Sequence, residues 1–181
     1  DKPLYVSDKS GLTVPRIRSI CRQVKRKHGL DVVVIDYIGL IGSDGKAFNR
    51  TAELGKISTG IVNIAKELEV PVILLAQLNR DSTKRPGKKP IASDLRDSGQ
   101  IEADAHCIIL VHRDMDSEEG QNGATELLMP KCRHAPVGSC VVQQQGKFAR
   151  FVNFAGREPT QEEVEINRPF ADQYKGRKNH G

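Results

Sequence analysis

Short apolar runs and longer amphipathic segments divide the first part of the chain. The runs occupy residues 32–35, 72–76 and 107–111. Runs of four or five apolar residues without alternation are typical of strands in a parallel sheet that is buried on both faces. We therefore expect these residues to form parallel strands that are covered by helices.

Two segments repeat apolar residues at helical spacing. The first follows Thr13 and Pro15, which suit a helix N-cap and a first turn, and it ends at Gly29. The second carries an apolar stripe of Leu54, Ile57, Ile61, Ile64, Ala65 and Leu68. The outer face of the first helix is basic, with Arg16, Arg18, Arg22, Lys25, Arg26 and Lys27. We interpret this face as solvated, although such charges also suit contact with nucleic acid.

The remaining segments are polar or alternate in hydrophobicity. We expect exposed loops at residues 38–50 and 79–90 and an acidic turn at 114–123. Residues 125–129, 139–144 and 148–154 resemble strands with short connections, which favours an antiparallel extension of the sheet. Residues 157–181 are polar and are expected to form a loosely attached tail. These patterns predict one mixed α/β domain over residues 1–156.

Composition changes this picture only slightly. Hydrophobic residues make up 38% and aromatic residues 4% of the 181 residues, so the core must be mainly aliphatic. The net charge of +5 suggests a polyanionic partner but equally suits an ordinary solvated surface. Because the sequence shows no secretory signal and no long apolar span, we expect a cytoplasmic protein without a membrane partner.

The four cysteines are Cys21, Cys107, Cys132 and Cys140, and they form no closely spaced pair. Cys132 and Cys140 near His134 can be imagined as metal ligands, but structural zinc sites usually pair their ligands at short spacing. We interpret the cysteines as isolated small apolar residues with reduced thiols.

Polar residues follow the first two apolar runs. Asp36 ends the first run and Gln77 ends the second. Because parallel strands present their carboxyl ends at one edge of a sheet, we expect Asp36 and Gln77 at the same edge. A carboxylate at such a position can hold Mg²⁺ beside nucleotide phosphates. The phosphate-binding pattern G-x-x-x-x-G-K-[ST] is absent from this sequence, so we do not expect a complete nucleotide site.

Four sequence blocks stand in a distinctive order. They are VVVIDYIGLI at 32–41, PVILLAQLNR at 71–80, SDLRDSGQIEAD at 93–104 and KCRHAPVG at 131–138. Their order and spacing resemble the DnaB-type hexameric replicative helicases, over residues from about 3 to 156. The resemblance implies a RecA-like fold with a mixed, mainly parallel sheet flanked by helices, present here as a partial domain that lacks the phosphate-binding loop.

The resemblance also implies roles for individual residues in binding ATP and Mg²⁺. Asp36 would be the Walker B acid that holds the metal, and Gln77 would sense the γ-phosphate. Lys131 and Arg133 would reach the γ-phosphate bound to a neighbouring subunit and neutralise the charge that develops during phosphoryl transfer. Alternation along a strand would let both point the same way. The alternatives are strand-end side chains that cap loops and an ordinary basic surface pair.

The block at residues 93–99 resembles a loop that binds single-stranded DNA. Its members Arg96, Asp97, Ser98 and Gly99 would lie along the phosphate backbone. An arginine supplies charge there, and main-chain N–H groups near a glycine can approach a phosphate closely. The alternative is a short helix that Asp94 caps, without any role in DNA binding.

Several positions depart from the pattern of the family. Gly39, Ala76, His106, Cys132 and His134 stand where Gln, Ser, Asp, Gln and Asn are usual. These departures suggest a divergent member of phage or prophage origin.

The expected function is part of an ATP-dependent helicase that translocates on single-stranded DNA and unwinds the duplex as a homo-hexamer. Primase and a helicase loader would be partners of regions outside this sequence, in the bacterial or host cytoplasm. The missing phosphate-binding loop fits either an excised fragment or a chain that has lost its motor. The alternatives are a non-hydrolysing RecA-like module that binds DNA or protein, and another RecA-like recombination ATPase.

Overall fold

The computed structural model of the chain describes residues 3–42, 49–79, 89–95 and 99–154. The chain forms two compact units. The helical unit comprises Asp1–Asn79 and Leu95–Asp104, and the sheet unit comprises Arg80–Asp94 and Ala105–Gly181. The domain boundary predicted at residue 156, the tail predicted at 157–181 and most of the basic loop predicted at 79–90 lie outside the described residues.

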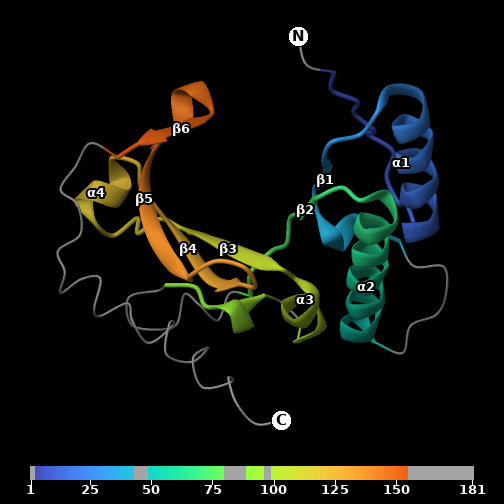
Figure 1. Ribbon diagram of the computed structural model, residues 1–181. Helices are drawn as coiled ribbons and strands as arrows, with labels where there is room; N and C mark the ends of the chain where they lie inside the picture. Colours follow the sequence, from blue (N-terminus) through green and yellow to red (C-terminus); the bar gives the residue numbers. More distant parts are fainter. Residues whose placement is uncertain (1–2, 43–48, 80–88, 96–98, 155–181) are drawn as a thin grey trace. The chain divides into compact units, whose positions relative to one another are not determined.

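The helical unit is built from two long helices and a short parallel sheet (Figure 1). Helix α1 spans Val14–His28 and α2 spans Arg50–Leu68, and strand β1 (Val33–Ile35) pairs in parallel with β2 (Val72–Leu74). The apolar stripe of α2 is buried as predicted, and Ile64 is only 1% exposed. One face of the sheet packs against this core through Val33, Ile35, Val72 and Leu74. The predicted strand–helix–strand order is therefore confirmed.

The ends of both helices follow local chemistry. Thr13 and Gly29 flank α1 as predicted, although the Thr13 side chain makes no capping hydrogen bond. At the start of α2, the side chain of Asn49 accepts a hydrogen bond of 2.8 Å from the N–H of Ala52. Such a cap satisfies one of the main-chain donors that a helix leaves unpaired. Asn49 therefore fixes where α2 begins.

Polar contacts join α1 to α2 at their solvent edge. Glu67 of α2 accepts a hydrogen bond of 2.5 Å from Arg22 and lies 3.5 Å from Arg18. The hydrogen bond from Arg22 is the main reason that the pKa of Glu67 is lowered. The helices also approach closely at Gly60, where a Cβ atom would lie 2.7 Å from the Val14 side chain. Part of the basic face of α1 thus serves helix packing.

The second face of the parallel sheet is uncovered within the helical unit. Val34 and Ile73 are paired across β1 and β2, and they are 60% and 55% exposed. Leu75 just beyond β2 is also exposed. The expectation of a sheet buried on both faces is therefore met on one face only, within the described residues of this unit.

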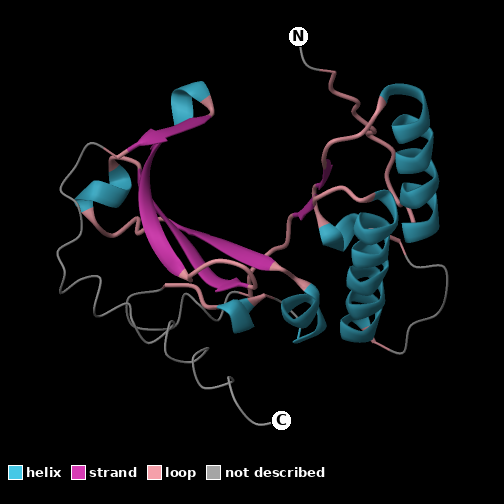
Figure 2. Cartoon of the chain, in the orientation of Figure 1, coloured by secondary structure: helices cyan, strands magenta, loops and turns pink. Residues whose placement is uncertain are grey.

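The sheet unit is an antiparallel sheet of strands in the order β3-β4-β5-β6 (Figure 2). The strands are β3 Cys107–His112, β4 Ala124–Cys132, β5 Gly138–Gln145 and β6 Arg150–Asn153. A short helix, α4 (Glu118–Gln121), lies in the predicted acidic turn, and a 3-10 turn, Gly146–Phe148, precedes β6. The predicted antiparallel strands are confirmed, but in the described residues they form a sheet of their own rather than an extension of the parallel sheet β1–β2.

Strand β3 differs from its predicted parallel pairing. Its hydrogen-bonded neighbour in the described structure is β4, and the two strands are antiparallel. The connection between them is short, whereas parallel neighbours need a long crossover. Chain length between the strands therefore favours the observed pairing.

A β-bulge sets the register at the end of β4. Ile108 pairs with Lys131 while Leu110 pairs with Leu128, so the residues between Leu128 and Lys131 outnumber those between Ile108 and Leu110. Pro130 lies within this irregularity, where its missing N–H does not interrupt regular pairing. The strand predicted to end at residue 129 therefore continues to Cys132.

Candidate functional site

Asp36 and Gln77 lie beyond the carboxyl ends of paired strands, as the sequence predicts. Ile35 and Leu74 are opposite each other, and the N–H of Leu75 donates to the carbonyl of Ile35 at 3.0 Å. Asp36 follows directly on one side, and Gln77 follows two residues after Leu75 on the other. Both are exposed, and in the described part of the chain neither side chain has a hydrogen-bond or ion-pair partner. The edge therefore presents a carboxylate and an amide that have no side-chain partner among the described residues.

A pocket of about 370 Å³ opens at this edge of the helical unit. It is lined by Tyr37, Ile38, Gly39, Arg50, Leu54, Ala76, Gln77, Leu95 and Ile101. The ring of Tyr37 lies over Gly39, where a Cβ atom would be 2.4 Å from the ring. Gln77 lines the pocket, whereas Asp36 does not belong to its lining. The two predicted residues therefore share an edge but face different surroundings.

Arg50 is a pocket residue without a role in the sequence prediction. It donates hydrogen bonds of 2.8 Å to the carbonyl of Gly39 and to the carboxylate of Glu53. These bonds hold the positive charge at the start of α2. Its only sequence signal is a basic residue beside a predicted loop, which is too common to identify a site.

The residue after Gln77 is paired with a residue of the block at 93–99 that is predicted to bind DNA. Leu78 and Leu95 form an isolated antiparallel bridge. Leu95 is buried, so this contact is a fixed point of the helical unit. The bridge therefore joins the main chain next to Gln77 to the residue that precedes Arg96 in the sequence.

The predicted DNA-binding residues are only partly described. Arg96, Asp97 and Ser98 lie outside the described residues, and Gly99 is the first residue of α3 (Gly99–Asp104). Gly99 is exposed. The Asp94 side chain accepts a hydrogen bond from Ile91 N–H at 2.8 Å, which closes the turn Ala92–Asp94 within the block. The alternative that Asp94 caps this helix stays a prediction.

Asp104 anchors α3 on α2. One carboxylate oxygen accepts hydrogen bonds from Ser58 at 2.8 Å and Thr59 at 3.1 Å, and the other accepts one from Gln100 at 2.8 Å. Ser58 is buried, so this contact lies inside the helical unit. Sequence reasoning missed the role of Asp104, because its partners on α2 are far away along the chain.

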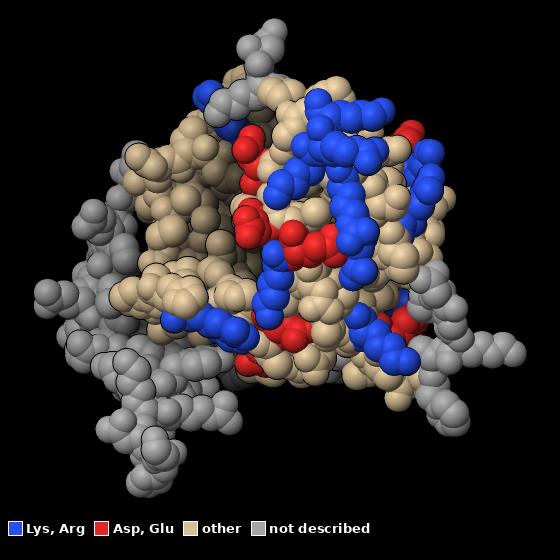
Figure 3. Space-filling view, turned by 45° about the vertical axis from the view of Figure 1, so that its right-hand side comes forward, with Lys and Arg blue, Asp and Glu red and all other residues tan. Residues whose placement is uncertain are grey.

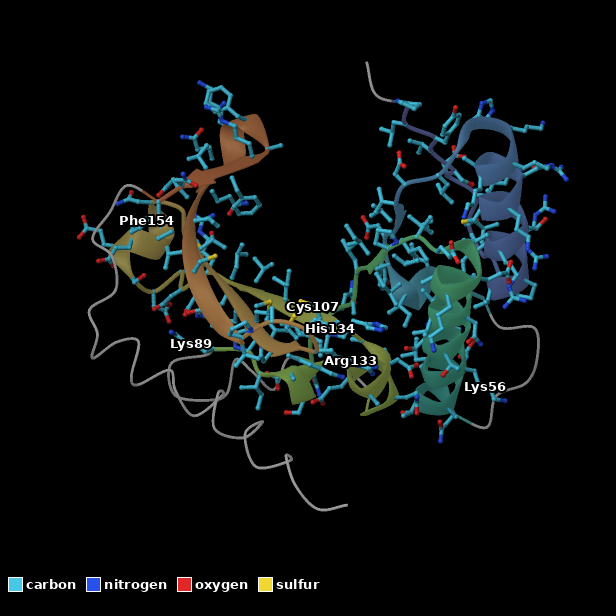
Figure 4. All side chains as sticks on the ribbon, viewed as in Figure 1. Lys56, Lys89, Cys107, Arg133, His134 and Phe154 are labelled. Atoms are coloured by element: carbon cyan, nitrogen blue, oxygen red, sulfur yellow. The ribbon has the colours of Figure 1, made fainter. Side chains whose placement is uncertain are left out.

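Lys131 and Arg133 lie at the end of β4 in the sheet unit. Lys131 belongs to the strand, and Arg133 follows the last strand residue. The N–H of Arg133 still donates to the carbonyl of His106 at 2.9 Å, so the ladder continues to Arg133. Arg133 is exposed and lies near Cys107 and His134 (Figure 4). The rings of His106 and His134 stack with centroids 6.5 Å apart.

Basic side chains are also prominent on the helical unit. Figure 3 shows Lys and Arg side chains running down the face that is turned forward, with acidic side chains among them. On α1, Arg16, Arg22, Lys25, Arg26 and Lys27 are exposed. The mixture of signs favours the interpretation of a solvated surface.

The site residues fit a Mg²⁺–nucleotide only in part. The free Asp36 carboxylate suits a metal that keeps most of its water ligands and takes one protein oxygen. Within the described residues, no group of His, Cys, Asp and Glu side chains could hold a metal by itself. The site therefore fits a metal that is held jointly with phosphates rather than by a protein cage.

The family of DnaB-like helicase C terminal domains matches residues 1–153. The chain belongs to this family. Among replicative DNA helicases DnaB, the protein of Pasteurella multocida (strain Pm70) is 44% identical over 159 residues, covering 86% of this chain and 34% of that protein. The replicative DNA helicase DnaB of Haemophilus influenzae is 40% identical. That match covers 84% of this chain and 33% of the Haemophilus protein. The chain thus spans about a third of the length of these curated relatives.

Solved structures agree with the DnaB-like assignment. One of them, an ATPase domain, is 38% identical with a TM-score of 0.75, and the match covers 81% of this chain and 53% of that one. A second solved structure is that of a DnaB-like replicative helicase and its interactions with primase. It is 38% identical with a TM-score of 0.77, and the match covers 82% of this chain and 37% of that one. The mixed α/β, RecA-like fold class is confirmed, as a partial domain. No helix in the described residues is both long and apolar enough to cross a membrane.

Proposed function

We propose that the intact protein is an ATP-dependent replicative DNA helicase that translocates on single-stranded DNA as a ring of six copies. The observation that carries the proposal is the family match over residues 1–153, with replicative helicases at 40–44% identity. The free carboxylate and amide beyond β1 and β2 support a nucleotide site at that edge. We also propose primase and a helicase loader as partners of regions outside this sequence, in the cytoplasm.

In this proposal the helical unit holds one side of the nucleotide. Bound Mg²⁺ would neutralise charge on the phosphate oxygens. Asp36 would hold the metal through its free carboxylate, and Gln77 would donate its amide toward the terminal phosphate. The bridge between Leu78 and Leu95 would pass a shift of Gln77 to the DNA-binding block. Asp104 would keep α3, which starts at Gly99, fixed on α2.

The sheet unit would act on a neighbouring copy. Lys131 and Arg133 would approach the terminal phosphate held by the next subunit and stabilise the charge that develops on it. Supplying such an arginine from a neighbour raises turnover by about 10³ to 10⁵. The placement of Arg133 in an exposed position at the end of a strand supports this role.

The test of the proposal uses the intact protein, forked DNA and Mg²⁺–ATP. We expect DNA-stimulated ATP hydrolysis and unwinding, and both should be lost in Asp36→Ala. The matched control is Asp31→Ala, because Asp31 is an exposed aspartate just before the same strand. Binding of DNA by the intact protein without any turnover would instead support the non-hydrolysing module.

The DNA-binding block is tested by the salt dependence of affinity for single-stranded DNA. Neutralising phosphates releases counterions, so affinity falls as salt rises. We expect Arg96→Ala to weaken binding and to lower the slope of this dependence by about 1. Arg16→Ala on the exposed face of α1 serves as the control. A larger loss in Arg16→Ala than in Arg96→Ala would move the DNA site to α1.

A further inference from the structure

Cys107 and Cys132 face each other across β3 and β4. They are the first residue of β3 and the last of β4, and they are directly paired in the ladder. The hydrogen bond from Arg133 N–H to the carbonyl of His106 lies one step outside this pair. Since hydrogen-bonded and non-hydrogen-bonded pairs alternate in antiparallel sheets, the cysteines form a non-hydrogen-bonded pair. In such pairs the Cα atoms lie about 4.5 Å apart, which is within the range a disulfide spans.

The two thiols interact and are accessible. Desolvation, and after it the neighbouring Cys132, raise the pKa of the Cys107 thiol. Cys107 is exposed and Cys132 is half-buried, so a small reagent can reach the pair from solvent. Figure 4 shows Cys107 near Arg133 at this end of the sheet.

The other cysteines lack such a partner. Cys21 is buried in the core of the helical unit. Cys140 is exposed on β5, but the residue opposite it on β4 is Leu127. In the described ranges, no group of three or more His, Cys, Asp or Glu residues could hold a metal ion. The geometry at Cys107 and Cys132 is therefore that of a dithiol rather than of a metal site.

We propose that Cys107 and Cys132 form a reversible disulfide, with a low-molecular-weight disulfide as the oxidant. The Cys107 thiolate attacks one sulfur of the oxidant and releases its other half as a thiol. Cys132 then attacks the Cys107 sulfur, forms the cross-strand bond and releases the second half. Two protein thiols are oxidised and one disulfide is reduced to two thiols, which take up the two protons.

The bond would restrain the basic pair of the proposed catalytic site. Cys132 stands between Lys131 and Arg133, so a bond from Cys132 to β3 fixes the main chain that carries both side chains. We expect the oxidised protein to turn over ATP more slowly, because these side chains can no longer adjust to a neighbouring subunit. This consequence rests on the proposed function, whereas formation of the bond does not.

The bond is tested on the intact protein with oxidised glutathione as the probe. After alkylation of free thiols and digestion, mass spectrometry should find the peptides of Cys107 and Cys132 joined within one chain. Dithiothreitol should separate them. The reaction should speed up as the pH rises, because the thiolate is the attacking form. A stable glutathione adduct on Cys107 in the unmodified sequence, or a bond between chains only, would overturn the proposal.

Single substitutions separate the two steps of the reaction. Cys132→Ser should trap glutathione on Cys107, because the resolving thiol is gone. Cys140→Ser should leave the cross-strand bond unchanged. Trapping of glutathione on Cys107 to the same extent with and without Cys132 would contradict the proposed second step.

Turnover of ATP provides a separate measurement. Oxidised intact protein should turn over ATP several-fold more slowly than reduced protein, and the double variant Cys107→Ser, Cys132→Ser should remove this difference. If the bond forms and turnover does not change, the restraint on Lys131 and Arg133 is wrong. If the intact protein shows no turnover at all, the proposed function fails while the thiol measurements still decide the disulfide.

Discussion

The helical unit and the sheet unit are held together in different ways. In the helical unit, Ile57, Ile61 and Ile64 are the centre of a cluster that gathers α1, α2 and one face of the parallel sheet. The described part of the sheet unit buries few large apolar side chains, namely Ile108, Leu110 and Leu128. It relies more on ladders and on polar contacts, such as Arg113, which donates to Gly120, Gln121 and Gln144. In the described residues, the helical unit thus has the larger apolar core and the sheet unit the smaller one.

This difference matches the proposed division of work at the nucleotide. Asp36 and Gln77 follow strands that rest on the packed core, which suits side chains that must stay in place. Lys131 and Arg133 end a strand with less packing behind it, where local opening costs less free energy. A side chain that has to adapt to a neighbouring subunit benefits from such a position.

The largest expected effect tests whether the two units act on different copies. In the intact protein, Arg133→Ala should lower ATP turnover by about 10³-fold or more, and Asp36→Ala should abolish it. Mixed rings of these two variants should regain turnover, because some interfaces then combine an intact Asp36 with an intact Arg133. ATP hydrolysis across a series of mixing ratios measures this.

The control for mixing pairs Asp31→Ala with Arg150→Ala. Asp31 is an exposed aspartate before β1, and Arg150 lies on β6 of the sheet unit. Both variants should keep their turnover alone and together. Mixed Asp36→Ala and Arg133→Ala rings that stay inactive would place both residues in the same subunit's site.

Two substitutions in the helical unit compare its buried core with its uncovered sheet face by the free energy of unfolding. Ile64→Ala should lower the free energy of unfolding of the helical unit by about 2–5 kcal/mol, because it leaves a cavity beside a residue that is 1% exposed. Ile73→Ala on the uncovered face should change it by less than about 0.5 kcal/mol in the 181-residue chain. Hydrogen exchange, resolved by peptide, measures both. Equal losses would show that Ile73 is covered as well.

The helical unit was predictable because its signals are local and periodic. Thr13 and Gly29 mark the two ends of α1, and the apolar stripe from Leu54 to Leu68 marks α2. Only α2 and its loops separate the paired strands β1 and β2 along the chain. Placement of Asp36 and Gln77 at one edge followed from parallel pairing alone. In contrast, the exposure of Val34 and Ile73 depends on whether anything covers that face of the sheet. Their apolar character alone does not show that this face is uncovered.

The sheet unit was harder to predict because pairing depends on distant residues. The run at Cys107–His112 looks like a parallel strand by composition, yet β4 returns beside it as an antiparallel partner. The strand predicted at residues 125–129 continues through a bulge to Cys132. For the same reason Cys107 and Cys132 looked isolated along the chain and are neighbours in the fold. The roles proposed for the site residues remain predictions.

Replacement of a glycine should lower the stability of the sheet unit more than its small apolar core suggests. Gly123 has φ +103, and a Cβ atom there would lie 2.4 Å from the carbonyl oxygen of Gln144. The N–H of Gln144 also donates to the carbonyl of Gly123 at 2.8 Å, so the two backbones cannot separate without losing a bond. We expect Gly123→Ala to destabilise the sheet unit by about 1–3 kcal/mol. Gly146→Ala is the control, because nothing lies within 4 Å of its Cβ position.

The smallest expected effect is a loss of stability in the sheet unit at acid pH. Desolvation on β3 lowers the pKa of His112 from its ordinary 6.5, and Lys89 lowers it further, while Glu126 and Asp114 oppose the shift. The unfolded chain therefore binds a proton more readily than the fold. The stability that neutral His112 contributes is complete above pH 6.5 and is lost as the pH falls through the lowered pKa.

Hydrogen exchange of β3 and β4 measures this loss when it is compared at about pH 7.5 and about pH 5.5, on either side of the ordinary histidine pKa. Peptides of α2 serve as the internal reference. His112→Gln should reduce the difference between the two pH values, because the titrating ring is gone. Glu126→Gln should enlarge it, since Glu126 raises the pKa of His112 and lies opposite it on β4. A change of the same size in α2 would mean that acid acts on both units, and the contrast between the unit with the larger apolar core and the unit with the smaller one would not extend to pH.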